Sequence, residues 1–178
     1  MSNSTNEAQT SDNSEMITQE SIIRNTRMSA RHRLIEIIEK AKSFMSAQRN
    51  FIDIAKNILE TAEYAIPNAK WYGSTKANET YEHFLIQIEK ILTIAKQIFT
   101  DETCRNIFAN AERNLAIAKR MFKNENVEVC DDIFDINIYK NMIKNVEQVS
   151  LINERNYVDI ILNAQNLLAS VEHNLGMI

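Results

Sequence analysis

The sequence predicts an all-α protein, an antiparallel bundle of four main helices whose first and last members are long. The 178 residues include only 2 Gly and 1 Pro, fewer than sheets with tight turns need. Apolar residues also recur with a helical period along most of the chain. Hydrophobic residues at 44% and charged residues at 25% are ordinary for a globular domain. We therefore predict one helical domain over residues 15–178, preceded by a tail.

The tail is residues 1–14, which are almost wholly Ser, Asn, Thr, Gln, Asp and Glu. Such a segment cannot bury enough apolar surface to fold, so we expect it to be disordered. Its composition also resembles the unfolded export signals of bacterial secreted effectors. That resemblance implies, as one alternative, an effector delivered into a host cell.

We expect a less regular helix over residues 15–33, which either leads into the next helix or bends away from it. The segment is basic and holds Arg24, Arg27, Arg31, His32 and Arg33. Three of the arginines share one helix face. The four arginines either bind an anionic partner, such as a phosphate, an acidic membrane surface or an acidic protein, or form a solvated face. The solvated face is the simpler interpretation.

The organising element is a helix over residues 34–66. Large apolar residues recur every seven positions at Ile38, Met45, Ile52, Leu59 and Ile66. Between them lie Leu34, Ala41, Gln48, Ala55 and Ala62. A flanking row consists of Ile37, Phe44, Phe51, Ile58 and Ala65. Together these rows form the broad apolar face of a bundle helix. We predict that the helix ends at Ile66, because Pro67 disfavours helical geometry at the residue before it.

Residues 67–78 are predicted to be a loop. The aromatic pair Trp71 and Tyr72 lies in it and either caps the end of the core or forms an exposed contact site. Of these, the core cap is the simpler interpretation. Ser74, Thr75 or Asn78 would cap the next helix.

Two shorter helices are predicted over residues 79–99 and 102–123. Their apolar stripes are out of phase, because Phe99 and Phe108 are not separated by seven residues. Thr100, Asp101 and Glu102 have the character of a cap and an acidic first turn. We therefore predict a tight reversal at Thr100 to Thr103; the alternative is one kinked helix.

A loop is predicted over residues 123–132, followed by the last helix over residues 136–174, with Gly176 placed to end it. The apolar register of this helix includes Tyr139, Ile143, Val146, Tyr157, Ile160, Ala164, Leu167 and Val171. Ser150 and Asn153 interrupt it with polar side chains. We hypothesise that Gln48 and Asn153 meet in the bundle and fix the pairing register.

The composition excludes several kinds of site. Cys104 and Cys130 are too few for a zinc site and, across a straight helix, too far apart for a disulfide, so we expect free thiols in a reducing cytoplasm. Residues 1–20 hold four acids and no base, which accounts for the whole net charge of −4. The rest of the chain is balanced, which makes nucleic-acid binding improbable. Neither a transmembrane segment nor a secretory signal is expected.

Catalytic, metal and cofactor motifs are absent from the sequence, and we expect none of these activities. The favoured function is a non-enzymatic protein-protein interaction module: a scaffold, effector or structural subunit. Because the first and last helices extend past the middle two, apolar surface is left for a second copy or another protein, and we expect an oligomer. The alternatives are binding of an anionic surface through residues 24–33 and the secreted effector.

Overall fold

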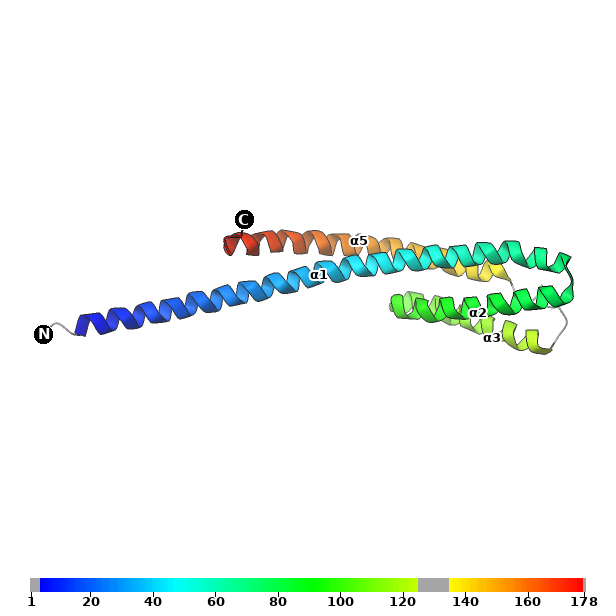
Figure 1. The fold of residues 1–178 in the computed structure, drawn as a ribbon, viewed down its shortest axis with the longest axis horizontal. Helices are drawn as coiled ribbons and strands as arrows, with labels where there is room; N and C mark the ends of the chain where they lie inside the picture. The colour runs from blue at the N-terminus through cyan, green and yellow to red at the C-terminus, as the bar shows by residue number, and fades with distance from the viewer. Residues whose placement is uncertain (1–3, 125–134, 178) are drawn as a thin grey trace. The chain divides into compact units, whose positions relative to one another are not determined.

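The computed structural model describes residues 4–124 and 135–177, with side chains for all of these except residues 4–10, 121, 123 and 124. The described part contains four helices and no strand (Figure 1). The helices are α1 (Ser4–Trp71), α2 (Ser74–Ile98), α3 (Glu102–Asn124) and α5 (Ile136–Asn174). The all-α prediction with long first and last helices is confirmed. The loop predicted over residues 123–132 falls mostly outside the described residues.

The chain divides into two compact units. We call residues 44–155 the four-helix unit, since they contain all of α2 and α3 together with parts of α1 and α5. Residues 1–43 and 156–178 form the two-helix unit, which consists of the remaining parts of α1 and α5. The single domain expected over residues 15–178 stays a prediction.

In the four-helix unit α1 and α5 are antiparallel. The Lys56 ammonium contacts Glu147 at 2.8 Å, and about two turns further along α1 Glu63 accepts a hydrogen bond from Lys140 at 2.9 Å. As the residue number rises on one helix, it falls by the same amount on the other. This constant register is that of two straight helices packed side by side.

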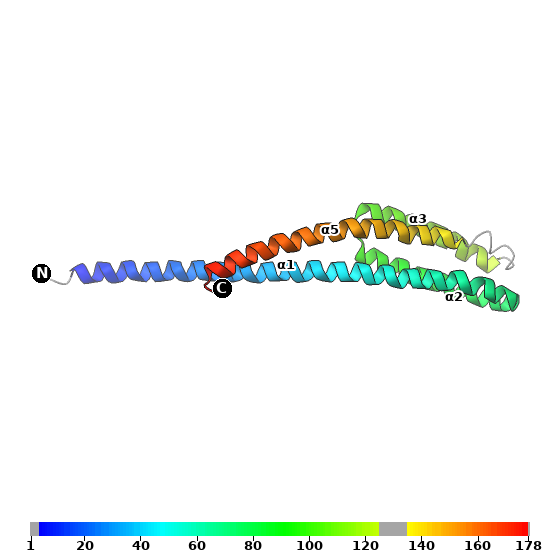
Figure 2. The ribbon, with the colours of Figure 1, turned by 90° about the horizontal axis from the view of Figure 1, so that it is seen from above.

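The tight reversal predicted between the two shorter helices is confirmed. Helix α2 ends at Ile98, Phe99 is extended, and α3 begins at Glu102. The backbone N–H of Cys104 donates to Asp101 Oδ1 at 2.9 Å, so Asp101 is the N-cap of α3. The two views show the pair α2 and α3 lying against the pair α1 and α5 in this unit (Figures 1 and 2). Antiparallel ion pairs join α2 to α3: Lys96 with Glu112, and Lys119 with Glu89.

One hydrophobic core runs through the four-helix unit and draws on all four helices. At its end nearest the reversal, the ring of Phe99 packs edge-on against Phe51, with centroids 5.6 Å apart, and against Phe108 at 6.3 Å. The apolar positions predicted for this core are buried there: Ile52, Ala55, Leu59, Ala62, Phe84, Leu85, Ile88, Leu92, Ala95, Ala111, Leu115, Ala118, Tyr139, Ile143 and Val146.

Helix α1 is longer than predicted at its N-terminus. It begins at Ser4, inside the segment 1–14 that was expected to be disordered; residues 1–3 lie outside the described part, and the side chains of residues 11–14 are exposed. The less regular helix expected over residues 15–33 leads into the organising helix without a break.

The predicted end of this helix at Ile66 is wrong, because α1 continues through Pro67 to Trp71. Proline forfeits one backbone hydrogen bond, but Ile66 and Ala69 are only 8% and 5% exposed and continue the buried stripe across it. Burial of these side chains against the core outweighs the local preference. The predicted loop over residues 67–78 therefore reduces to a short turn.

That turn also corrects two details. Gly73, with φ of 115°, is the residue before α2, which starts at Ser74 without a side-chain cap, so the predicted capping by Ser74, Thr75 or Asn78 is wrong. Trp71 and Tyr72 are 88% and 79% exposed, so they do not cap the core. They lie on the surface at the C-terminal end of α1.

Helix α5 ends at Asn174, and Gly176 terminates it as predicted. The N–H of Gly176 donates to the His173 carbonyl at 3.0 Å, and that of Met177 donates to the Glu172 carbonyl at 3.0 Å. With φ of 72° at Gly176, this is a Schellman motif, which needs a residue that adopts the left-handed conformation freely.

In the two-helix unit α1 and α5 are also antiparallel. Arg31 Nε contacts Glu172 Oε1 at 3.0 Å, and Arg27 donates to the Asn174 carbonyl at 3.2 Å. The buried apolar residues are few: Ile38, Ala41 and Ala164. Among the described residues, no second helix pair packs against α1 and α5 in this unit.

Candidate protein-binding face

The predicted arginine site divides into two kinds of residue. Arg31 lies seven positions before Ile38 on α1, and Arg27 lies seven before Leu34, so both occupy positions that are apolar further along the helix. There they contact the last turns of α5, where a cation pairs with Glu172 and with free helix carbonyls. Arg24 and Arg33 are exposed. Two of the four arginines, Arg27 and Arg31, therefore make contacts within the chain.

A row of apolar side chains on α1 is exposed in the two-helix unit. Met16, Ile23 and Ile37 are 58%, 49% and 43% exposed, with half-buried Ala30 between them. Their seven-residue spacing is that of the flanking row. On α5, Ile160 and Leu167 have the same spacing and are 44% and 59% exposed. We call these residues of α1 and α5 the apolar face.

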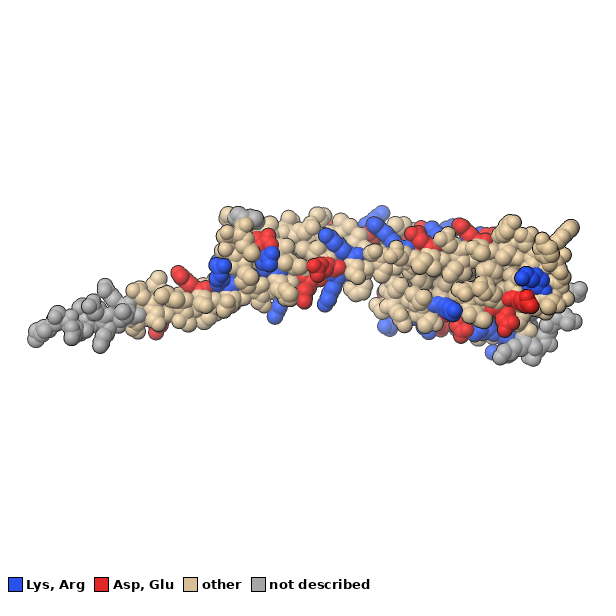
Figure 3. All heavy atoms as spheres, viewed as in Figure 1, with Lys and Arg blue, Asp and Glu red and all other residues tan. Residues whose placement is uncertain are grey.

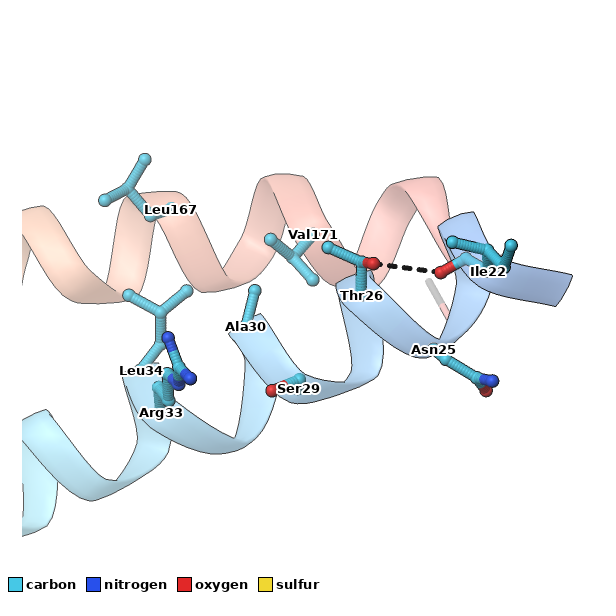
Figure 4. A pocket seen from close by; sticks show the side chains of 9 residues that line it. All are labelled: Ile22, Asn25, Thr26, Ser29, Ala30, Arg33, Leu34, Leu167 and Val171. Atoms are coloured by element: carbon cyan, nitrogen blue, oxygen red, sulfur yellow. Dashed lines mark hydrogen bonds between the residues drawn. The ribbon is translucent and has the colours of Figure 1, made fainter. Parts of the chain in front are cut away.

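The apolar face borders a groove between the two helices of this unit. The groove has a volume of about 780 Å³. In Figure 4, Ala30 and Leu34 of α1 point toward α5, and Val171 points back toward α1. Thr26 lines the groove too, but its hydroxyl donates to the Ile22 carbonyl at 2.9 Å (Figure 4), so it presents mainly its methyl group. The full lining is Ile22, Asn25, Thr26, Ser29, Ala30, Arg33, Leu34, Leu167 and Val171.

Most of the same heptad positions are covered in the four-helix unit, although Phe44, the first flanking-row residue of that unit, is 50% exposed. Phe51 of the flanking row is 5% exposed and packs on Phe99 at the end of α2. On α5 the row that contains Ile160 and Leu167 also contains Val146, which is 0% exposed, and Asn153, which hydrogen-bonds Asp101 before α3. These positions are thus the ones that face α2 and α3.

The surroundings of the apolar face are nearly free of net charge. Residues 160–171 of α5 hold no charged side chain. Where charges occur on the side drawn in Figure 3, basic and acidic residues alternate, and neither forms a continuous patch. Charge depletion at the centre with mixed charges around it is typical of protein interfaces.

Gln48, which we hypothesised to meet Asn153, hydrogen-bonds a different residue of α5. Gln48 is 3% exposed and accepts a hydrogen bond from the Ser150 hydroxyl at 3.3 Å, one turn before Asn153. The Asn153 side chain instead hydrogen-bonds Asp101. A polar pair between α1 and α5 is therefore present, but with the other of the two polar residues that interrupt the α5 stripe.

Among the described residues, Asp101 and Cys104 are neighbouring titratable groups whose pKa values both depart from their ordinary values. Partial burial would raise the pKa of Asp101, but hydrogen bonds from the Cys104 thiol and N–H and from Asn153 hold it below its usual value. Burial, with the Asp101 carboxylate beside it, raises the pKa of Cys104 to about 12. A nucleophilic cysteine needs a depressed pKa, so this thiol acts as a helix-cap donor in the core.

Within residues 4–124 and 135–177, no three His, Cys, Asp or Glu side chains are grouped as metal ligands. Over the same residues, every helix falls short of the length and hydropathy of a membrane span. None of the protein-family models, curated proteins or solved structures compared with this chain matches it.

Sequence reasoning found the flanking row only from Ile37 onward. The missed signal is that its spacing extends back through Ala30, Ile23 and Met16. The two neighbouring heptad rows carry arginines in this segment: Arg24 and Arg31 in the row of Ile38, and Arg27 in the row of Leu34. Because of these arginines, the apolar stripe as a whole is not continuous over residues 16–33.

Proposed function

We propose that the chain is a non-enzymatic protein-binding module and that the apolar face of the two-helix unit is its binding surface. The observation that carries the proposal is the contrast along one heptad register: Phe51 and Val146 are buried by α2 and α3, whereas Ile23 and Leu167 in the same rows are exposed. Exposed contiguous apolar surface on a protein marks an interaction site.

Helix-on-helix packing is the expected mode of binding. A partner that lays apolar helices on this face would repeat the packing that α2 and α3 provide in the four-helix unit. The exposed pair Trp71 and Tyr72 is a second candidate contact, since aromatic side chains are enriched in interface anchors.

The anionic-surface alternative has less support. Arg27 and Arg31 have partners on α5, and the charges in the two-helix unit are of both signs. The effector alternative and the cytoplasmic location rest on composition alone and stay predictions.

Photo-crosslinking in cells that produce the chain tests the proposal. A photoreactive residue in place of Leu167 should give covalent adducts with protein. The matched control is Leu162 on the same helix, which is 53% exposed against 59% for Leu167 but points to roughly the opposite side, five residues away at about 100° per residue.

Adducts at position 167 and not at 162 would support the apolar face, whichever protein is captured. Equal adducts at both positions would point to non-specific contact, and no adducts at 167 would contradict the proposed function.

A further inference from the structure

We infer that the partner covering the apolar face is a second copy of this chain, so that two two-helix units pack into one intermolecular helical bundle. This inference rests on the proposed function and adds the identity of the partner. The interface would be isologous, with the same patch used by both copies.

The heptad rows of the apolar face also occur in a packed interface of the same protein. In the four-helix unit, the rows that contain Phe51 and Val146 are covered by an antiparallel helix pair, α2 and α3. The partner of the same rows at Ile23 and Leu167 must therefore present apolar helices at similar spacing. The two-helix unit of a second copy is itself an antiparallel helix pair with an exposed apolar row on each helix.

The apolar side of the two-helix unit is large enough for a dimer interface. Helix α1 from residue 16 to residue 43 rises about 40 Å, and α5 lies beside roughly 25 Å of it. With a helix diameter of about 10 Å, one face of this unit measures on the order of 700 Å². A standard specific interface buries roughly 600–1,000 Å² per partner, so an area of this size falls within the range of stable dimers.

The charges of the two-helix unit are compatible with self-association. The basic residues of the two-helix unit are Arg24, Arg27, Arg31, Arg33, Lys40 and Lys42, and its acidic residues are Glu7, Asp12, Glu15, Glu20, Glu36, Glu39, Asp159 and Glu172. The two signs nearly balance, so two copies do not repel each other strongly. A face with so little net charge gives no electrostatic preference for a highly charged partner or an anionic membrane.

The test is the molar mass of the purified full chain by light scattering, over a wide range of protein concentration. The wild-type chain should reach the mass of a dimer. Leu167→Lys should raise the dimer dissociation constant about a hundredfold or more, because it places a charge in both symmetric halves of an apolar interface. The matched control Leu162→Lys should dimerise like the wild type.

Circular dichroism checks that each variant keeps its helix content. If Leu167→Lys loses helix, Ile23→Lys on α1 tests the same face from the other helix. A wild-type chain that stays monomeric overturns the inference, and adducts of position 167 with a different protein would then leave the proposed function intact. A dimer that survives both Leu167→Lys and Ile23→Lys also overturns it.

Discussion

Two stretches of the same helix pair differ in what surrounds them. In the four-helix unit, α1 and α5 carry a second pair, α2 and α3, and the flanking row is buried at Phe51. In the two-helix unit the same helices have no second pair, and the row is exposed at Ile23 and Ile37. Heptad spacing alone therefore does not determine which element covers an apolar helix face. Where the apolar rows continue beyond their intramolecular cover, we propose that another molecule binds.

The largest expected difference is between Phe51→Ala and Ile23→Ala, which alter one heptad row in the two units. At a concentration where the chain is monomeric, Phe51→Ala should lower the free energy of unfolding by about 3–5 kcal/mol, since it opens a cavity in the core. Ile23→Ala should change it by less than about 0.5 kcal/mol. Urea unfolding followed by circular dichroism measures both. Similar costs would remove the contrast between the units.

The next effect concerns the buried polar pair of the four-helix unit. Ser150→Ala removes the hydroxyl that donates to Gln48 and should cost about 1–3 kcal/mol of unfolding free energy, because the amide oxygen loses its partner in the core. The double variant Gln48→Leu with Ser150→Ala should recover most of that loss in the same urea assay. A double variant less stable than Ser150→Ala would mean that the pair is needed for packing.

A smaller effect is expected at the cap of α3. Asp101→Ala should cost about 1 kcal/mol of unfolding free energy at neutral pH. Because the pKa of Asp101 is lower in the folded chain, its contribution is present above the unfolded pKa of about 3.9 and is lost as the pH falls through the folded value.

Unfolding curves between neutral pH and about pH 3 for the wild type and Asp101→Asn separate this contribution from those of other carboxylates. The asparagine still caps the helix but does not titrate there, so its stability should fall less on acidification. Identical pH profiles would show that the carboxylate charge does not matter.

The smallest effects are expected at surface ion pairs. Lys56→Ala in the four-helix unit should change the free energy of unfolding by less than about 1 kcal/mol, because its pair with Glu147 is partly exposed. Arg31→Ala should alter global stability as little, yet it should speed amide hydrogen exchange in the last turns of α5, which Arg31 holds through Glu172. Unchanged exchange there would mean that α5 is held by other contacts.

The fold was predictable from the sequence wherever local and tertiary signals agree. Asp101 and Glu102 are good residues for a helix start and also lie where two stripes change phase, so the reversal was predicted correctly. At Pro67 the signals conflict: the local rule ends the helix, whereas the buried side chains of Ile66 and Ala69 continue it. The burial of Ile66 and Ala69 depends on contacts with other helices, and the spacing of residues within one helix does not reveal those contacts.

The candidate site was predictable only in part. The surplus length of the first and last helices indicated uncovered apolar surface, but not which residues form it. The exposure of Trp71 and the pairing of Arg31 with Glu172 depend on contacts between residues far apart in the chain. Sequence spacing within one helix carries no information about such contacts.

Hydrogen exchange of the full chain at low and high protein concentration tests the central claim most directly. If a second copy covers the apolar face, amides of residues 158–173 should exchange quickly in the dilute chain and slowly in the concentrated one, and Leu167→Lys should abolish the difference. Amides of residues 51–66 should be protected at both concentrations. Protection of residues 158–173 that is the same at both concentrations and unaffected by Leu167→Lys would contradict the account.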